Sequence, residues 1–319
     1  MDKPPLDGWA MVICNPVSGA GRGLSILKSV RRTLDRAGVA YMHEVSSARG
    51  EVARLARAAV LSGCSTVIVI GGDGSFFEAV NGVIGPLDLD VAARGEGTLD
   101  VALGLVQAGR GSDFGRSAGV PSDVAAACAR LVAGRTTHFD LGHVSYRSFD
   151  GEDRRRFFAN AAGLGFDAEV SLRANAGSRM LGSTIPYLSS LLRTLLSYHN
   201  KNIEVSVDGG QSWSARANSF VVANGQYFGG GMKIAPDASL SDGIFDITML
   251  GDLGKVDLVR NVPRVYDGSH VSHPKVTTAR ARTVRVDSAE RVLLQADGEV
   301  LGLAPAEFTI VPAALKMIV

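Results

Sequence analysis

Residues 66–75, Thr-Val-Ile-Val-Ile-Gly-Gly-Asp-Gly-Ser, join a short apolar run to a glycine-rich turn. The run Thr66 to Ile70 is bounded by glycines, which is typical of a central strand in a parallel sheet buried on both faces. A helical pattern follows the turn, with apolar residues at Phe76, Phe77, Val80 and Val83. Ligands of open α/β sheets bind beyond the carboxyl ends of the strands, so this turn is a candidate ligand site.

Strands and helices alternate from residue 9 to about residue 135, as in parallel βαβ units. Further strands are predicted at residues 9–14, 39–45 and 101–106, and helices over residues 24–34, 52–60 and 124–132. Later in the chain a two-residue alternation takes over, at residues 203–207, 220–223, 244–250, 284–286 and 292–296. We therefore predict an α/β N-terminal domain with a parallel sheet, followed by a mostly antiparallel, β-sandwich-like second domain. Helices near residues 181–198 and 253–266 would interrupt the second domain.

The composition excludes several classes of protein. The 319 residues are enough for about two domains, and 33 Lys and Arg against 32 Asp and Glu give a formal net charge of +1. This balance argues against a nucleic-acid binder. The three cysteines, Cys14, Cys64 and Cys128, form no CxxC pair and suit a reducing compartment. Because residues 1–8 lack the apolar core of a secretory leader and no apolar run reaches about 18 residues, we expect a cytoplasmic protein with at most peripheral membrane contact.

Two more glycine-rich turns follow predicted strands, Asn15 to Gly23 after the first and Gly109 to Phe114 after the fourth. The earlier of the two lacks both the GK[ST] ending of a P-loop and the GxGxxG pattern. Backbone N–H groups at such strand-to-helix turns can bind phosphate oxygens. Asp73 would repel a bare phosphate, so its carboxylate suits a site with a divalent cation between them; alternatively, it only caps the following helix. Together the three turns favour a site for a magnesium–nucleotide complex.

The three turns read Asn-Pro-Val-Ser-Gly at 15–19, Gly-Gly-Asp-Gly-Ser at 71–75 and Gly-Arg-Gly-Ser-Asp-Phe at 109–114. They resemble the nucleotide-binding motifs of the soluble bacterial diacylglycerol kinase family, which is related to sphingosine and ceramide kinases. In the second domain, residues 224–246 are similar to the family's NG…GGGM…AP.A.L.DG.FD signature, and residues 295–299 (Gln-Ala-Asp-Gly-Glu) to its DGE segment. A GGDG turn alone would also suit NAD kinases, whereas the signature at 224–246 would not.

The resemblance implies an ATP- and Mg²⁺-dependent lipid kinase with the fold of NAD kinases and diacylglycerol kinases. ATP would lie between the domains, at Asn15, Pro16, Val17, Ser18, Gly19, Ser46, Gly71, Gly72, Asp73, Gly74, Ser75, Phe76, Phe77 and Arg110. Glu299 would be the general base that takes the proton from a lipid hydroxyl during its attack on the γ-phosphate. Asp73 and Asp113 would organise the catalytic Mg²⁺. A structural Mg²⁺ would bind the carboxylate of Asp242 and the backbone oxygens of Ser239 and Ile244.

The same resemblance implies the domain boundaries and the partners. The C-terminal residues would rejoin the first domain, which predicts domains at 1–137 with 306–319 and at 138–305. The acceptor would be a hydroxylated membrane lipid, in the first place diacylglycerol, which would become phosphatidic acid. The enzyme would associate peripherally with the inner face of the membrane. Its partners would be ATP and this lipid, with no nucleic acid. The resemblance leaves open whether the chain forms a homodimer.

The chain departs from the family pattern in two of the turns. Ala20 stands where lysine is usual, with Arg22 as the nearest cation, and Arg110 and Ser112 alter the usual GTGND turn. These departures leave open a non-catalytic lipid- or nucleotide-binding protein on the same scaffold, and an NAD kinase-like enzyme is a further alternative. The presence of Glu299 weighs against the non-catalytic protein.

Several segments also have simpler interpretations. Asp297-Gly298 and Asp242-Gly243 can be ordinary hairpin turns, because Asp-Gly is a strong hairpin signal. The leucine stripe at residues 188–196 can pack on the second domain's sheet, or it can line a lipid cleft or dip into a bilayer. His270 and His273 are expected on a loop rather than in a metal site.

Overall fold

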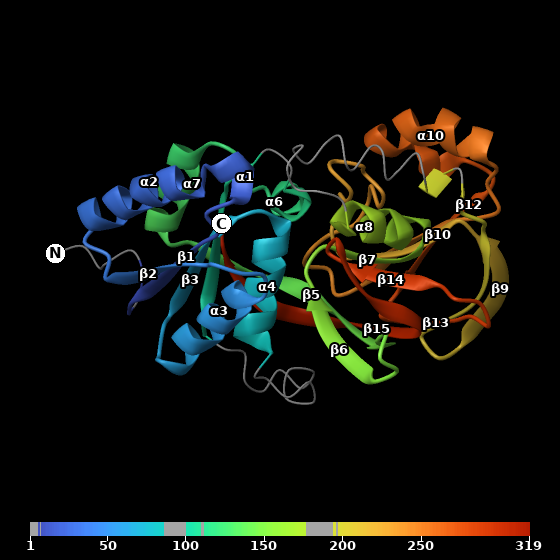
Figure 1. Ribbon diagram of the computed structural model, residues 1–319, viewed down its shortest axis with the longest axis horizontal. Helices are drawn as coiled ribbons and strands as arrows, with labels where there is room; N and C mark the ends of the chain where they lie inside the picture. The colour runs from blue at the N-terminus through green and yellow to red at the C-terminus, as the bar shows by residue number, and fades with distance from the viewer. Residues whose placement is uncertain (1–5, 7, 86–99, 110–111, 177–193, 196) are drawn as a thin grey trace. The chain divides into compact units, whose positions relative to one another are not determined.

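The computed structural model describes residues 6, 8–85, 100–109, 112–176, 194, 195 and 197–319 (Figure 1). The chain divides into two compact units, unit 1 (Met1–Leu141 with Val311–Val319) and unit 2 (Gly142–Ile310). The chain passes from one unit to the other twice, each time inside a strand: β5 (Thr136–Arg147) and β15 (Glu299–Ile318). Because these strands continue across the change, no linker marks it in the sequence. The boundaries predicted after residue 137 and before residue 306 lie a few residues away.

Unit 1 is built on a parallel sheet with the strand order β2-β1-β3-β4, and the end of β15 pairs with β4. The strands span Ala10–Cys14 (β1), Tyr41–Val45 (β2), Thr66–Gly71 (β3) and Ala102–Gln107 (β4). Strands β1, β3 and β4 are buried along their whole length, as predicted for β3. Cys14 pairs with Ile70 and Ile70 with Val106, so the turns after these three strands start at one edge of the sheet.

Helices cover both faces of this sheet (Figure 1). They span Gly23–Arg36 (α2), Glu51–Leu61 (α3), Asp73–Ile84 (α4), Asp113–Ser117 (α6) and Val124–Ala133 (α7). On one face, Val30 and Leu34 of α2 share a core cluster with Leu131 of α7 and with Val12 and Ile68 of the sheet. On the other face, α3 and α4 pack against each other. Burial on both faces explains why the strands of this unit are apolar throughout.

Unit 2 is mostly antiparallel, with the strand order β12-β11-β10-β7-β14-β15 and with β13, β8, β9, β5 and β6 attached to this row. The strands are Asp153–Phe158 (β6), Ala161–Gly165 (β7), Lys201–Val207 (β8), Gln211–Ala217 (β9), Ser219–Ala223 (β10), Phe245–Leu250 (β11), Val276–Ala281 (β12), Thr283–Asp287 (β13) and Leu293–Ala296 (β14). Among the described residues of this unit, the helices are Phe166–Ala176 (α8), Lys255–Asp267 (α10) and the short 3₁₀ helix Ser269–Ser272 (η2). The predicted fold class is therefore confirmed.

Two further predictions concern segments outside the sheets. His270 is buried in η2, with Nε2 at 3.2 Å from the carbonyl oxygen of Ile234, so it is a core residue. Within the described ranges, no group of three or more His, Cys, Asp and Glu side chains could hold a metal ion. The leucine stripe at 188–196 lies almost entirely outside the described residues. None of the described helices has the length and apolar character needed to cross a membrane.

The buried His143 of β5 makes the stability of unit 2 depend on pH. Burial, with a contribution from Arg155, lowers the pKa of its imidazole from 6.5 to about 4. Between these pH values the unfolded chain binds the proton and the folded chain does not, so stability falls as the pH falls through this range. We expect a loss of about 3 kcal/mol from pH 7 to pH 4 that the His143→Leu variant lacks. Urea unfolding of both proteins at the two pH values measures this difference, and equal losses would contradict it.

Candidate functional site

Hydrogen bonds tie together the three turns at the carboxyl edge of the unit 1 sheet. Asn15 Nδ2 donates to Ser75 Oγ at 2.9 Å, which links the turn after β1 to the turn after β3. The N–H of Ala108 donates to the carbonyl oxygen of Gly71 at 2.9 Å, which brings the end of β4 to the same place. The structure thus assembles the three turns that the sequence singles out.

Gly19 and Arg22 shape the turn after β1. Gly19 has a φ of 61°, and a Cβ atom there would lie 1.9 Å from the carbonyl oxygen of Ala108, so this position requires glycine. Arg22 donates from Nη2 to the same oxygen at 2.6 Å and from Nε to the Gly19 oxygen at 3.2 Å. Arg22, the cation nearest to the missing lysine, therefore fastens this turn to the end of β4.

Helix α4 begins directly after β3 and presents the N–H groups of its first turn. Gly72 is the extended N-cap, and Asp73, Gly74 and Ser75 follow as the first helical residues. The N–H groups at such a position have no partner within the helix. A Cβ atom at Gly72 or Gly74 would meet nothing within 4 Å, so the approach to this turn is open. The start of this 12-residue helix is suited to bind a phosphate group.

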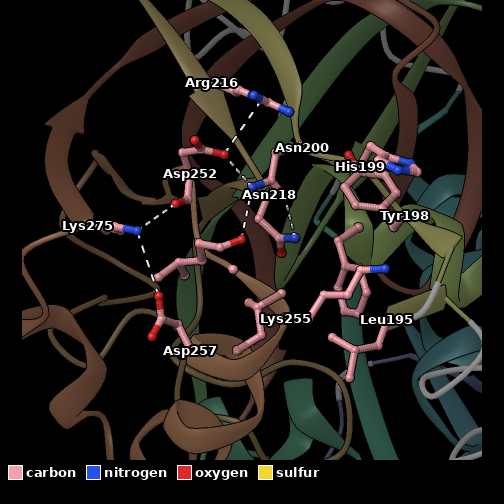
Figure 2. A pocket seen from close by; sticks show the side chains of 14 residues that line it. Leu195, Tyr198, His199, Asn200, Arg216, Asn218, Asp252, Lys255, Asp257 and Lys275 are labelled. Carbon is pink, nitrogen blue, oxygen red and sulfur yellow. Dashed lines mark hydrogen bonds and ion pairs between the residues drawn. The ribbon is translucent and has the colours of Figure 1, made fainter.

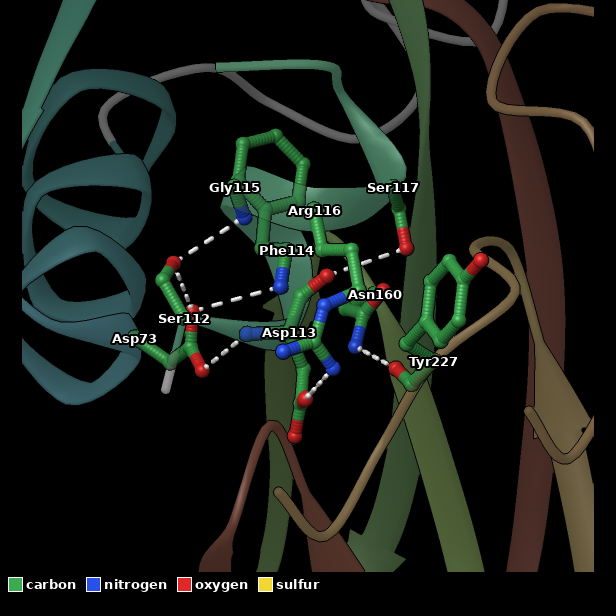
Figure 3. Close-up of polar contacts among 9 residues, drawn as sticks. All are labelled: Asp73, Ser112, Asp113, Phe114, Gly115, Arg116, Ser117, Asn160 and Tyr227. Atoms are coloured by element: carbon green, nitrogen blue, oxygen red, sulfur yellow. Dashed lines mark hydrogen bonds and ion pairs between the residues drawn. The ribbon is translucent and has the colours of Figure 1, made fainter. Parts of the chain in front are cut away.

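Asp73 holds the start of α6 (Figure 3). One carboxylate oxygen accepts the Ser112 hydroxyl at 2.6 Å and the Phe114 N–H at 3.3 Å, and the other accepts the Asp113 N–H at 2.8 Å. Burial raises the pKa of this carboxyl, and the three hydrogen bonds oppose the rise. Asp73 is therefore a helix cap, as one interpretation of the sequence expects, but the helix it caps is α6 and not α4.

Asp113 is the first residue of α6 and is almost completely buried. Its Oδ1 lies 3.6 Å from Nη1 of Arg116, one turn further along the same helix, and its carbonyl oxygen accepts the Ser117 hydroxyl at 3.1 Å (Figure 3). The two aspartates that the sequence singles out thus meet at one helix start, where both carboxylates already contact protein groups.

Some of the predicted nucleotide contacts lie in the core of unit 1. Phe76 and Phe77 are each 1% exposed, and Phe76 stacks on Phe114 with ring centroids 4.3 Å apart. Their side chains belong to the core, so the predicted contact of these two residues with a nucleotide stays a prediction for their backbone groups. Ser46 is also buried, and its N–H donates at 2.9 Å to the carbonyl oxygen at the end of β1. Arg110 lies outside the described residues.

In unit 2, Glu299 is the first residue of β15 and follows a two-residue hairpin turn. Asp297 and Gly298 have φ values of 47° and 82° and connect Ala296 to Glu299, its partner in the ladder. Positive φ at both turn residues is the type I′ pattern that Asp-Gly favours. The hairpin predicted as the simpler interpretation is therefore present, and it carries the half-buried Glu299 at its end.

The carboxylate of Asp297 connects this hairpin to the start of β7 by hydrogen bonds. It accepts the N–H groups of Ala159, Asn160 and Ala161 at 2.7, 3.0 and 3.0 Å. Hydrogen bonds to an ionised acceptor are stronger than neutral ones, so three of them on one carboxylate hold the turn firmly. The position of Glu299 therefore depends on Asp297.

A buried hydrogen-bond chain supports the same hairpin. Gln295 Oε1 accepts the Gly298 N–H at 2.9 Å, and Gln295 Nε2 donates to Asp167 at 2.9 Å. Ser219 Oγ donates to the other oxygen of Asp167 at 3.0 Å, and burial raises the pKa of this carboxyl. This series of hydrogen bonds cannot be predicted from the sequence, because Asp167 lies 128 residues from Gln295. The only local signal is the place of Gln295 beside the DGE segment.

The signature at residues 224–246 also holds residues 159–161, to which the Asp297 carboxylate is hydrogen-bonded. The N–H groups of Asn224 and Gly225 both donate to the carbonyl oxygen of Asn160 at 2.8 Å, and Asn224 Nδ2 donates to that of Ala159 at 2.8 Å. The side chain of Asn160 in turn donates to the carbonyl oxygen of Tyr227 (Figure 3). Residues 159–161 are thus held by the signature and by Asp297 together.

The loop predicted to hold a structural Mg²⁺ has more carboxylates than cations. Asp242 pairs with Arg280, whose Nε also lies 3.6 Å from Asp246. Burial raises the pKa of Asp246; Arg280 opposes this rise, while Asp242 and Asp237 add to it. Among the described residues, Oδ2 of Asp246 is buried without a hydrogen-bond partner. The carboxylates of Asp242 and Asp246, both beside Arg280, offer hard oxygen donors of the kind that Mg²⁺ prefers, together with the buried Oδ2 of Asp246.

Comparisons with known proteins match both units to known families. Residues 9–144 match the diacylglycerol kinase catalytic domain, and residues 160–319 match the YegS C-terminal NAD kinase beta sandwich-like domain. The chain is 31% identical over 312 residues to the diacylglycerol kinase of Mycobacterium tuberculosis (strain ATCC 25618 / H37Rv), which covers 98% of this chain and 95% of that protein. It is 29% identical over 301 residues to the diacylglycerol kinase of Bacillus subtilis (strain 168), over 94% and 92% of the two chains.

The fold is also similar to that of a solved structure. A crystal structure of a diacylglycerol kinase from Bacillus anthracis str. Sterne superimposes with a TM-score of 0.72, over 97% of this chain and 96% of that chain, at 20% identity. At this identity the likeness concerns the fold, and it agrees with an α/β unit followed by an antiparallel unit.

Proposed function

Because this chain belongs to the diacylglycerol kinase family, as the matches of both units and the 31% identical relative show, we propose that it transfers the γ-phosphate of ATP to the hydroxyl of diacylglycerol. Membership confirms the predicted resemblance and a kinase that phosphorylates a lipid hydroxyl. The donor, the acceptor and the residue roles are the proposal. The observation that carries it is the Glu299 hairpin, which Asp297 and Gln295 hold from two sides.

Unit 1 binds ATP at the turns that follow β1 and β3. The contacts come from residues 15–19 and 71–75, chiefly through backbone N–H groups at the start of α4, which the open approach beside Gly72 and Gly74 supports. Asp73 and Asp113 shape the turn before α6. Mg²⁺ bound with the nucleotide supplies charge neutralisation on the phosphates.

Glu299 is the general base of the transfer. Its carboxylate takes the proton of the acceptor hydroxyl, whose oxygen forms a bond to the γ-phosphorus. The bond from this phosphorus to the β–γ bridging oxygen breaks, and ADP leaves with the electron pair. Phosphoryl transfer depends on positioning and charge neutralisation, so the rigid support of the hairpin matters as much as the carboxylate.

The test uses purified protein, ATP labelled at the γ-phosphate and mixed micelles of single lipids. Label in phosphatidic acid, and less in phosphorylated sphingosine or ceramide, is the expected result. Label in a nucleotide product when NAD is added would favour the NAD kinase-like alternative. ATP binding without transfer to any hydroxylated lipid would favour a non-catalytic protein.

The fit of the Asp242 loop to a cation gives a separate prediction for stability. The backbone oxygens of Ser239 and Ile244 complete this site. We expect the melting temperature to be about 2–4 °C higher with Mg²⁺ than with chelator, because a cation that binds only the folded chain stabilises it. The Asp242→Ala variant should melt lower and show no such difference, whereas Asp287→Ala, at an aspartate paired with Arg285 elsewhere, should keep it. If the melting temperature of the wild-type protein were the same with Mg²⁺ and with chelator, this site would have to be dropped from the proposal.

The acceptor lipid places the enzyme at the inner face of the membrane. Because diacylglycerol stays in the bilayer, the protein has to reach it by peripheral association, for which the net charge of +1 gives little general attraction to anionic lipid. A particular surface of the protein therefore has to make the contact.

A further inference from the structure

Helix α10 (Lys255–Asp267) turns an apolar face to solvent. The exposed fractions of its large apolar residues are 62% for Val256, 55% for Val259, 41% for Val262 and 51% for Tyr266. At 100° per residue these positions lie on one side of the helix. We call these four residues the α10 stripe. A surface helix normally turns its apolar side to the core, so this arrangement is the reverse of the usual one.

The opposite side of α10 is packed and hydrogen-bonded, which fixes the stripe outward. Val265 packs against a core cluster of unit 2, and its carbonyl oxygen accepts the Lys233 N–H at 2.8 Å. Arg264 donates to the Ser269 carbonyl oxygen at 3.1 Å and to the Ser272 hydroxyl at 2.8 Å. Because these inward contacts include polar groups with defined partners, rotation of the helix would break them. The stripe is therefore a fixed surface feature.

Two exposed cations of α10 itself, Lys255 and Arg260, flank the N-terminal end of the stripe at 100° per residue. Lys255, Lys275 and Arg216 line a pocket of about 470 Å³ at this end of the helix (Figure 2). Lys275 lies 3.7 Å from Asp257, and Arg216 lies 3.6 Å from Asp252, yet their side chains stay about half exposed. These ion pairs fix the cations in place while leaving part of each cation in water. Asp257 and Asp252 partly neutralise Lys275 and Arg216. The exposed Lys255 and Arg260 beside the apolar stripe are therefore the cations that suit phosphate headgroups above a hydrocarbon layer.

We propose that the α10 stripe is the surface through which unit 2 docks on an anionic phospholipid bilayer. The inference rests on the proposed function, since the acceptor of the reaction is a membrane lipid. The valines enter the acyl boundary, Tyr266 lies at the headgroup level that tyrosine favours, and Lys255 and Arg260 contact lipid phosphates. The stripe occupies one face of one helix, so the contact is shallow and reversible.

Vesicle co-sedimentation in the absence of ATP tests the docking surface apart from catalysis. The probes are vesicles of phosphatidylcholine with roughly a third of phosphatidylglycerol, and vesicles of phosphatidylcholine alone. We expect wild-type protein to bind the anionic vesicles more tightly, and Val256→Ser/Val259→Ser to bind them on the order of a hundredfold more weakly. The matched control is Leu24→Ser/Leu61→Ser, which removes two exposed leucines of unit 1 and should bind like wild type.

Activity separates failure of docking from failure of the reaction. The α10 double variant should keep wild-type turnover on a dispersed short-chain diacylglycerol and lose it on diacylglycerol embedded in vesicles. Wild-type vesicle binding by this variant, with its melting temperature unchanged, would overturn the proposal. The proposal would also be overturned if the wild-type protein did not bind vesicles and formed a dimer that the variant no longer formed. The stripe would then contact a second copy of the chain. If the wild-type protein bound vesicles but phosphorylated no lipid, the docking surface would be supported and the proposed reaction would be wrong.

Discussion

Glu299→Gln is expected to lower the turnover of lipid phosphorylation by about 10²–10⁴-fold, the usual contribution of a general base. Glutamine has the shape of glutamate but does not take a proton at neutral pH. The hairpin that carries residue 299 is held by Asp297 and Gln295, so the backbone stays in place when the carboxylate is lost. The loss should therefore appear in kcat, with KM for ATP and the melting temperature close to wild type.

The control for this variant lies on the same strand. Glu307 is an exposed residue of β15 whose carboxylate lies 3.9 Å from Arg285, and Glu307→Gln should keep wild-type turnover. Initial rates over a range of ATP and diacylglycerol concentrations give kcat and KM for both variants. Turnover within a few-fold of wild type in Glu299→Gln would show that another group takes the proton, and the proposed chemistry would fail.

Local patterns predict the framework of this site well. The apolar run at 66–70 and the glycines after it predict β3, the start of α4 and the turn between them, because each depends on residues close in sequence. The Asp-Gly pair at 297–298 predicts its hairpin for the same reason. Asp73 is different, since its partners Ser112 and Asp113 come to it only through the parallel pairing of β3 with β4. A helix cap supplied from another helix leaves no mark in the local pattern.

Burial and exposure are the properties that the sequence predicts least well. Phe76 and Phe77 follow a turn that is predicted to contact a nucleotide, yet the direction of their side chains is set by the helix period, which points both rings into the core. The helix at 253–266 is predicted from its apolar spacing, and the same spacing would normally mark its inward side. The inward contacts of Val265 and Arg264 place the α10 stripe outward instead, which only the tertiary structure determines.

Asp297→Asn is expected to lower both turnover and stability, because one carboxylate holds three N–H groups of residues 159–161. An amide keeps one acceptor oxygen and turns an NH₂ group toward the N–H groups that faced the other oxygen. A buried donor without an acceptor costs roughly 1–3 kcal/mol, so we expect a loss of about 2–3 kcal/mol in the free energy of unfolding. The freed hairpin would misplace Glu299, and kcat should fall on the order of tenfold or more.

Asp208 offers a matched control for this last variant. It also begins an Asp-Gly hairpin, with φ values of 49° and 67° at Asp208 and Gly209, and its carboxylate accepts the N–H groups of Arg282 and Thr283 at 2.9 Å each. Asp208→Asn should therefore also cost stability while leaving kcat unchanged, because this hairpin carries no proposed catalytic group. Urea unfolding and initial rates on both variants separate the two effects. Equal losses of turnover at equal stability would mean that Asp297 acts only through the fold, and its role in placing Glu299 would have to be abandoned.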